Sequence, residues 1–295
     1  PVFTYKEIVL SGQVFDPGEL IQIDTEKNLD AILEVDPLTI KNIIVVGAWR
    51  GNEVASFLRY PNATVYCFEP NETNYNHLVD RWGSNKRVVC FKAACASFDG
   101  ESTLNEASLT GNDSLLPIKK DSKTGLTLVK VHTIKTVKLD SVKELEGRHI
   151  DLLWADTQGY ELEVLSGATE LLKRTTSLFL EVYKNNMDYQ GGVTYEELAT
   201  FLEEKGFNCL AEGIDINNIG GNAFFLKKGL TTNAFKEDVY ELRIKNSLQE
   251  VSRKKKLLNI KMVQVLTTYT PVRLKTLIRK ILFQNFTKNF TFFNI

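Results

Sequence analysis

The sequence has few of the residues that metal sites and disulfide frameworks require. Its 295 residues include three histidines and four cysteines, and no two cysteines form a C-x-x-C pair. His77, His132 and His149 are far apart, which is not the spacing of metal ligands. We therefore expect no bound metal, and we expect reduced, buried thiols of the kind found in cytoplasmic proteins.

Long apolar runs are absent as well. No stretch of 18 consecutive apolar residues occurs, so we expect no membrane-spanning helix. The first ten residues, PVFTYKEIVL, lack the basic start and the apolar core of a secretory signal. Because 43% of the residues are hydrophobic and 25% are charged, the composition indicates a globular protein. We expect a cytoplasmic protein with one large domain, alone or with an appendage.

Acidic residues are missing from one end of the chain. Residues 251–295 contain 10 Lys and Arg and no Asp or Glu, whereas the other 250 residues carry a charge balance of −11. A compact basic run at 253–256 and a basic amphipathic pattern after Pro271 predict a basic, mostly helical extension over residues 229–295. This extension could bind an anionic membrane surface, another subunit or the body of the protein. Nucleic acid is not expected, because the body is acidic and no known reader motif occurs.

Residues 43–70 form the most informative stretch of the sequence. It reads IIVVGAWRGNEVASFLRYPNATVYCFEP, which predicts a strand, a glycine turn, a short helix and a second strand that ends on an acid. Gly47 and Gly51 let the backbone turn sharply beside a bound cofactor. Glu69, at the tip of the second strand, can accept the hydroxyls of a ribose. The glycine spacing is not G-x-G-x-x-G, which favours S-adenosylmethionine, a cofactor without phosphate, over a dinucleotide.

The next segments continue the alternation of helix and strand. Asn71–Trp82 is a predicted helix, and Val88–Phe91 is a predicted third strand. Small residues after it, among them Ala94, leave room for a flat adenine. Asp99–Gly100 indicates a hairpin turn into the following strand. The polar residues 105–127 predict a long loop over the site.

A second informative stretch lies at residues 150–183. It predicts a buried strand ending on Asp156, a helix with an apolar face over 162–172 and a strand that carries Glu181 near its end. A helix that opens at Thr194 and a final pair of strands after it complete the pattern. Strands that alternate with helices indicate a mostly parallel sheet with helices on both faces.

The order of these motifs resembles the FkbM-type S-adenosylmethionine-dependent methyltransferases. The family signature is D-V-G-A-N-x-G, F-E-P, a third strand containing Ala, D-x-E-G-x-E-x-x-V-L-x-G-A and a strand ending L-E-V. This chain has V-V-G-A-W-R-G, F-E-P, Ala93-Ala94, D-T-Q-G-Y-E-L-E-V-L-S-G-A and L-E-V, at residues 45–51, 68–70, 93–94, 156–168 and 180–182. The resemblance covers about residues 40–228. Val45 and Gln158 replace acids of the signature, and Trp49 replaces its asparagine.

The resemblance implies an α/β fold of the Rossmann-like class I methyltransferase type. Its sheet is mostly parallel with a terminal antiparallel strand and has helices on both faces. The implied organisation is a cover segment over residues 1–42, a methyltransferase domain over 43–228 and the C-terminal extension. The implied activity is methyl transfer from S-adenosylmethionine to a hydroxyl of a sugar, a glycolipid or a similar polyhydroxylated acceptor.

The resemblance also implies roles for individual residues. Asp156 is the first candidate for the base or for orienting the acceptor, and Glu181 is the second. The predicted cofactor-binding residues are Gly47, Ala48, Gly51, Glu69 and Ala94. Two alternatives stay open: Asp156 could merely cap the following helix, and the departures at Val45 and Trp49 allow a catalytically silent scaffold. Neither the acceptor nor the oligomeric state follows from the sequence.

Overall fold

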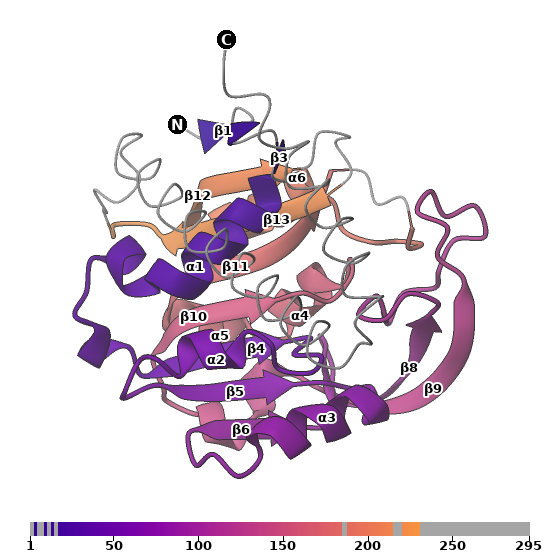
Figure 1. The fold of residues 1–295 in the computed structure, drawn as a ribbon, viewed down its shortest axis with the longest axis horizontal. Helices are drawn as coiled ribbons and strands as arrows, with labels where there is room; N and C mark the ends of the chain where they lie inside the picture. Colours follow the sequence, from indigo (N-terminus) through magenta and orange to yellow (C-terminus); the bar gives the residue numbers. More distant parts are fainter. Residues whose placement is uncertain are drawn as a thin grey trace, which may run out of the picture. The chain divides into compact units, whose positions relative to one another are not determined.

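In the part of the chain that the structure describes, eight strands pair into one main sheet. The computed structural model describes residues 3–4, 9–10, 13–14, 17–184, 188–214 and 220–230. Across the sheet the strands are β1 (Phe3–Thr4), β12 (Phe207–Ile214), β13 (Gly220–Lys227), β11 (Thr175–Tyr183), β10 (Ile150–Ala155), β4 (Asn42–Val46), β5 (Thr64–Phe68) and β6 (Val88–Phe91) (Figure 1). Only β13 runs antiparallel to its neighbours among these paired strands. The last strand within the described residues is therefore the antiparallel one, as predicted.

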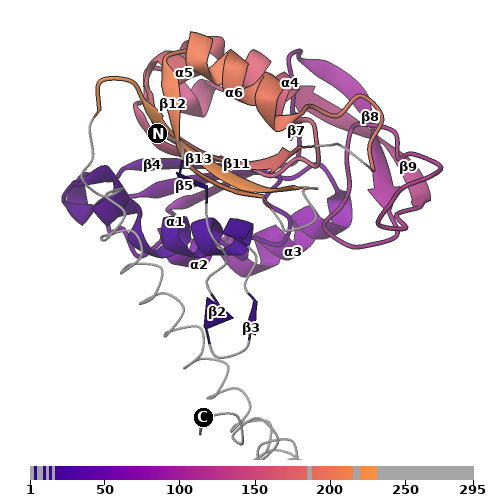
Figure 2. The same cartoon turned by 90° about the horizontal axis from the view of Figure 1, so that it is seen from above.

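The central strands are apolar because helices cover both of their faces. All five residues of β4 are buried, and its neighbours β5 and β10 are almost wholly buried. Figure 2 shows α4 (Glu161–Ser166), α5 (Thr169–Lys173) and α6 (Tyr195–Glu204) on one face and α1 (Pro17–Leu33), α2 (Val54–Phe57) and α3 (Glu72–Trp82) on the other. Burial on two faces removes the period-two alternation of polar residues, so such strands read as continuous apolar runs.

Two helices start where the sequence predicts. The Asn71 side chain accepts hydrogen bonds from the N–H groups of Thr73 and Asn74 and so caps α3. Thr194 and Glu197 form a reciprocal capping box at the start of α6. These caps satisfy backbone donors that have no partner within the helix.

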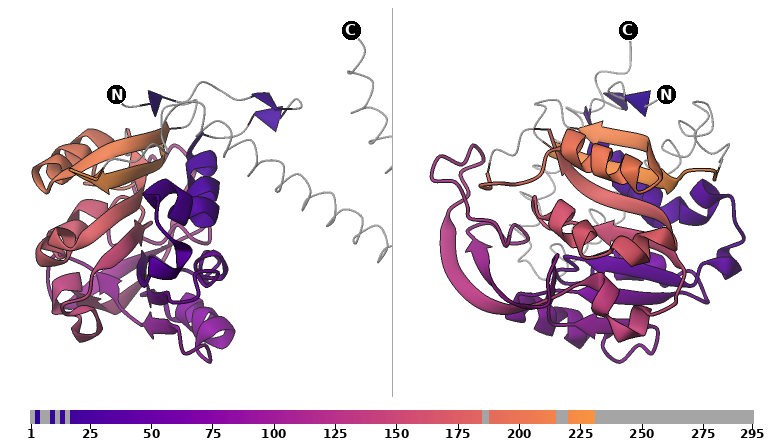
Figure 3. Two further views of the ribbon diagram at one scale, coloured as in Figure 1. Left: turned by 90° about the vertical axis from the view of Figure 1, so that its left-hand side faces the viewer. Right: turned by 180° about the vertical axis from the view of Figure 1, so that it is seen from behind.

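The hairpin predicted at Asp99–Gly100 is wrong. β8 (Gly100–Ala107) pairs instead with the more distant β9 (Leu128–Val137), and β7 (Ala94–Cys95) pairs with the other edge of β9. The Asp99 side chain accepts from Lys138 N–H and from the Ser141 hydroxyl, so it secures the far end of β9. The loop therefore begins only after Ala107. Figure 3 shows β8 and β9 (magenta) as a curved ribbon beside the main sheet.

The predicted helix over 162–172 is two short helices, α4 and α5, separated at Gly167. A Cβ at Gly167 would lie 1.9 Å from the Ala96 carbonyl oxygen, so the backbones pack too closely for a side chain. The Asp140 carboxylate then accepts from Glu170 N–H and Leu171 N–H and caps α5. Three 3-10 helices span Pro37–Thr39, Leu139–Ser141 and Lys143–Leu145.

The segment before β4 lies against the sheet. α1 packs on β12 and β13, and β1 extends the sheet beyond β12. Two further short strands, β2 (Val9–Leu10) and β3 (Gln13–Val14), pair with each other. The predicted three-part division of the chain stays a prediction, because nearly all of the basic extension lies outside the described residues. No helix within the described ranges is long and apolar enough to cross a bilayer.

Candidate functional site

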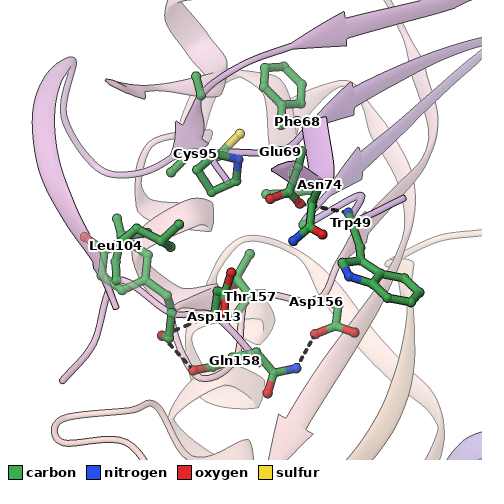
Figure 4. Close-up of a pocket in the computed structure, with 18 of the residues that line it drawn as sticks. Trp49, Phe68, Glu69, Asn74, Cys95, Leu104, Asp113, Asp156, Thr157 and Gln158 are labelled. Carbon is green, nitrogen blue, oxygen red and sulfur yellow. Dashed lines mark hydrogen bonds between the residues drawn. The ribbon is translucent and has the colours of Figure 1, made fainter. Parts of the chain in front are cut away.

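A cavity lies at the carboxyl ends of β4, β5 and β10, where parallel α/β sheets usually bind ligands. It encloses about 560 Å³ of empty space, including its opening to solvent. Four of the seven predicted site residues line it: Gly47, Glu69, Ala94 and Asp156. Figure 4 shows the side chains of Glu69 and Asp156 among those that line the cavity. The other three, Ala48, Gly51 and Glu181, are not among the residues that line it.

Gly47 brings the end of β4 close to the end of β10. Its φ is +76°, and a Cβ there would lie 1.9 Å from the carbonyl oxygen of Asp156. Asp156 N–H donates to Val46 O at 3.0 Å, which continues the pairing of the two strands to the last residue. Only glycine meets both demands, a left-handed backbone and no side chain.

Gly51 and Ala48 also shape the glycine turn. Gly51 has a φ of +68°, and a Cβ there would lie 2.6 Å from the Leu78 side chain on α3. Its carbonyl accepts from the Trp82 indole at 2.8 Å. Ala48 is fully buried, and its N–H donates to Phe68 O at 3.0 Å. These two residues shape the turn by packing, on the side away from the cavity.

Glu69 points into the cavity from the end of β5. Its Oε2 accepts from Trp49 N–H and its Oε1 accepts from Asn71 N–H, both at 2.8 Å. The side chain is 5% exposed, and burial raises the pKa of its carboxyl to about 8. Because each carboxylate oxygen has two lone pairs, both oxygens can still accept a hydroxyl. The arrangement therefore fits a ribose diol.

A wall of the cavity comes from the loop after β8. Asn71, besides capping α3, donates from Nδ2 to Asp113 Oδ2 at 2.8 Å. Asp113 Oδ1 accepts from Ala107 N–H at 3.0 Å, and burial raises the pKa of its carboxyl. Ser114 is buried and donates to the carbonyl oxygen of Gln158 at 3.0 Å. The loop was predicted to cover the site, but the link between Asn71 and Asp113 has no signal in the sequence.

Two of the family departures lie in the glycine turn and in the strand that leads into it. Trp49 lines the cavity with a φ of +45°, a region that asparagine tolerates better than an aromatic residue does. Its indole N–H is buried and has no hydrogen-bond partner in the structure, and the Arg50 guanidinium lies 4.9 Å from the ring centroid. An unpaired buried donor at a cavity wall is suited to a polar ligand. Val45 is fully buried in β4 and does not line the cavity.

Asp156 and Glu181 are joined through the third departure, Gln158. The Gln158 amide nitrogen donates to Asp156 Oδ1 at 2.7 Å and to Glu181 Oε2 at 2.9 Å. Both carboxyls are half-buried, and burial raises the pKa of each. Neighbouring carboxylates raise the pKa of Glu181 further, well above its usual range. Glu181 thus belongs to the site without lining the cavity.

Glu161 holds the turn between β10 and α4 from inside. It is fully buried, and its Oε1 accepts from Thr157 N–H, from the Thr157 hydroxyl and from Gly159 N–H. Burial raises the pKa of its carboxyl to about 7. The role of Glu161 is therefore to stabilise this turn. Across the described ranges, no group of three or more His, Cys, Asp or Glu is placed to hold a metal ion.

Comparison with known proteins identifies the family to which the chain belongs. Residues 46–209 match the model of the methyltransferase FkbM domain. A curated relative, the 2-O-methyltransferase NoeI of Sinorhizobium fredii (strain NBRC 101917 / NGR234), is 25% identical over 175 residues, which is 54% of this chain and 70% of that protein.

Solved methyltransferase structures are similar to this chain at low sequence identity. Fibrillarin of Aeropyrum pernix, with natively bound S-adenosylmethionine, has a TM-score of 0.40 at 10% identity and covers 69% of this chain and 76% of its own. Magnesium protoporphyrin IX methyltransferase of Synechocystis PCC 6803 has a TM-score of 0.39 at 11% identity, with 74% of this chain and 86% of that one covered. The family match spans more than half of the chain. The chain therefore belongs to the FkbM family of S-adenosylmethionine-dependent methyltransferases.

Proposed function

We propose that this protein is an O-methyltransferase whose acceptor is a hydroxyl of a sugar, a glycolipid or a similar small polyhydroxylated molecule. The observation that carries the proposal is the pair of half-buried carboxyls, Asp156 and Glu181, beside the turn that Gly47 makes. The relative named as a 2-O-methyltransferase supports a hydroxyl acceptor. S-adenosylmethionine supplies the electrophilic methyl group when it is bound.

Within this proposal, Asp156 removes the proton from the acceptor hydroxyl. A base is most effective when its pKa lies near the working pH, and burial moves the pKa of the Asp156 carboxyl upward in that direction. Burial and the neighbouring carboxylates also raise the pKa of the Glu181 carboxyl, and we assign Glu181 to positioning the acceptor. Asp156 lines the cavity and Glu181 does not, which favours the same assignment.

The cofactor side of the site is assigned to the turn and the end of β5. Glu69 is proposed to accept hydrogen bonds from the ribose hydroxyls, and Gly47 leaves space for the cofactor because it has no side chain. Ala94, which also lines the cavity, would face the adenine ring, because a small residue leaves room for a flat group. Ala48 and Gly51 are proposed to keep the shape of the turn without touching the ligand.

Transfer of a labelled methyl group tests this function. The purified protein would be incubated with methyl-labelled S-adenosylmethionine and a panel of neutral glycans, glycolipids and polyols, followed by mass spectrometry of the products. We expect the label on a hydroxyl oxygen of one acceptor class, and we expect Asp156→Asn to abolish it. Label found only on nitrogen or carbon would contradict the proposal. Glu144→Gln, an exposed change outside the cavity lining, is the control.

A further inference from the structure

Gln158 lies at the centre of the polar network beside the cavity. Its side chain is 7% exposed, and its amide nitrogen donates to both Asp156 and Glu181. Figure 4 shows the amide next to the Asp156 carboxyl, at the wall of the cavity. Gln158 replaces an acid of the family signature with a neutral amide. An amide carries two N–H donors, one for each carboxylate.

Two tyrosine hydroxyls contact the oxygen end of the Gln158 amide. The Tyr183 hydroxyl donates to Gln158 Oε1 at 3.1 Å, and the Tyr189 hydroxyl lies 3.3 Å from the same atom while it donates to Asn112 O at 2.7 Å. A hydroxyl donor at Oε1 and carboxylate acceptors at Nε2 permit only one orientation of the amide. The side chain therefore cannot rotate without losing hydrogen bonds at both ends.

The backbone of Gln158 is also held in an uncommon conformation. Its φ is +56°, in the left-handed region that non-glycine residues rarely occupy. Its carbonyl oxygen accepts from the Ser114 hydroxyl of the loop across the cavity. Strain of this kind persists where the surroundings demand it, and it is concentrated at functional sites. Here the conformation directs the amide between β10 and β11.

We infer that Gln158 is a positioning residue: its amide holds Asp156 and Glu181 together and aims the Asp156 carboxylate at the acceptor hydroxyl. The inference rests on the proposed function. Two carboxylates held close together repel each other when both are ionised, and a neutral donor between them reduces that repulsion without adding charge. The titratable groups that surround the amide are Asp156, Glu161, Glu181 and the two tyrosines.

Carboxyl titration by ¹³C NMR tests the inference without an acceptor. Side-chain ¹³C labels on Asp and Glu would be assigned with Asp156→Asn and Glu181→Gln and followed across pH. Gln158→Met keeps the length of the side chain but removes both donors. We expect it to move the Asp156 titration to higher pH by about one unit, the size of a lost hydrogen bond to a charged group. Gln158→Glu, which adds a third carboxyl, is expected to move it further.

Two controls separate positioning from folding. Gln190→Glu makes the same chemical change at an exposed site and is expected to leave the Asp156 titration unchanged. Tyr183→Phe leaves Gln158 in place but removes the donor to its Oε1, so it is expected to shift the titration in the same direction as Gln158→Met. This variant also decides the matter if Gln158→Met does not fold. Cofactor affinity, measured by calorimetry, is expected to stay within about threefold of the wild-type value in all variants.

The outcomes distinguish this inference from the proposed function. An unchanged Asp156 titration in a folded Gln158→Met, or in Tyr183→Phe, would overturn the positioning role whatever the turnover. A shifted titration together with a drop in kcat at unchanged acceptor KM is the expected result. If the titration shifts but wild-type protein methylates no hydroxyl in the acceptor panel, the proposed function fails and the role of Gln158 in holding the pair stands.

Discussion

Glu69 gives the sharpest prediction, because its environment links cofactor binding to pH. Burial raises the pKa of this carboxyl to about 8, so the free protein keeps the proton over most of the neutral range. A ribose diol donates two hydrogen bonds and needs an ionised acceptor, so binding expels the proton. The affinity for S-adenosylmethionine is therefore expected to weaken as the pH falls below about 8.

The size of the effect follows from the pKa. Between about pH 9 and about pH 6 the ionised fraction of Glu69 falls about a hundredfold, which limits the loss of binding free energy to roughly 2.7 kcal/mol. Calorimetry at several pH values measures it directly. Titrations in buffers of different ionisation enthalpy should show close to one proton released per cofactor bound at about pH 6.5.

Glu69→Gln serves as the test variant. An amide can accept on one atom only, so one of the N–H groups of Trp49 and Asn71 loses its partner, and the ribose meets a weaker acceptor. We expect weaker binding with most of the pH dependence gone, and we expect Glu69→Ala to abolish measurable binding. Glu72→Gln, an exposed neighbour on α3, is the matched control. Equal affinity of wild type and Glu69→Gln at both ends of the pH range would refute the reasoning.

Three further predictions concern the turn, the base and the C-terminal extension. Gly47→Ala should lower the free energy of unfolding in urea by about 3 kcal/mol, whereas Gly125→Ala, also at positive φ but with open space around it, should cost only about 1 kcal/mol. Asp156→Asn should bind cofactor normally but lose turnover, and full activity of this variant would exclude Asp156 as the base. In the wild type, turnover should rise with pH through a pKa above the usual Asp range. Replacing the basic residues 253–256 by Gln should weaken co-sedimentation with anionic but not neutral vesicles, and equal sedimentation would reject the membrane alternative.

The parts of the fold that the sequence predicts well are those with a local cause. Val88–Phe91 and Ile150–Ala155 are strands over the predicted residues because each is an apolar run between turn signals. The site residues Gly47, Glu69 and Asp156 come together because parallel strands place their carboxyl ends at one edge of the sheet. These statements need only the order of the motifs along the chain.

The parts that the sequence does not predict depend on partners far away in the chain. β8 pairs with β9 across the loop between them, although Asp99–Gly100 has the composition of a hairpin turn. Glu181 contacts Gln158 without lining the cavity, a placement that depends on how β11 pairs with its neighbours and not on the local sequence. The sequence shows which side chains can form hydrogen bonds, but tertiary packing decides which of them pair with each other.

Asn71 shows how such packing restricts evolution. Taken alone, the start of a helix accepts Asn, Asp and Ser about equally well, and Thr somewhat less well. Here the side-chain oxygen starts α3 while the side-chain nitrogen holds Asp113 of the opposite wall. Asp at this position would place two carboxylates against each other, and Ser or Thr would not supply the second donor. The substitutions that this position tolerates are therefore set by a loop some forty residues away rather than by the helix that it begins.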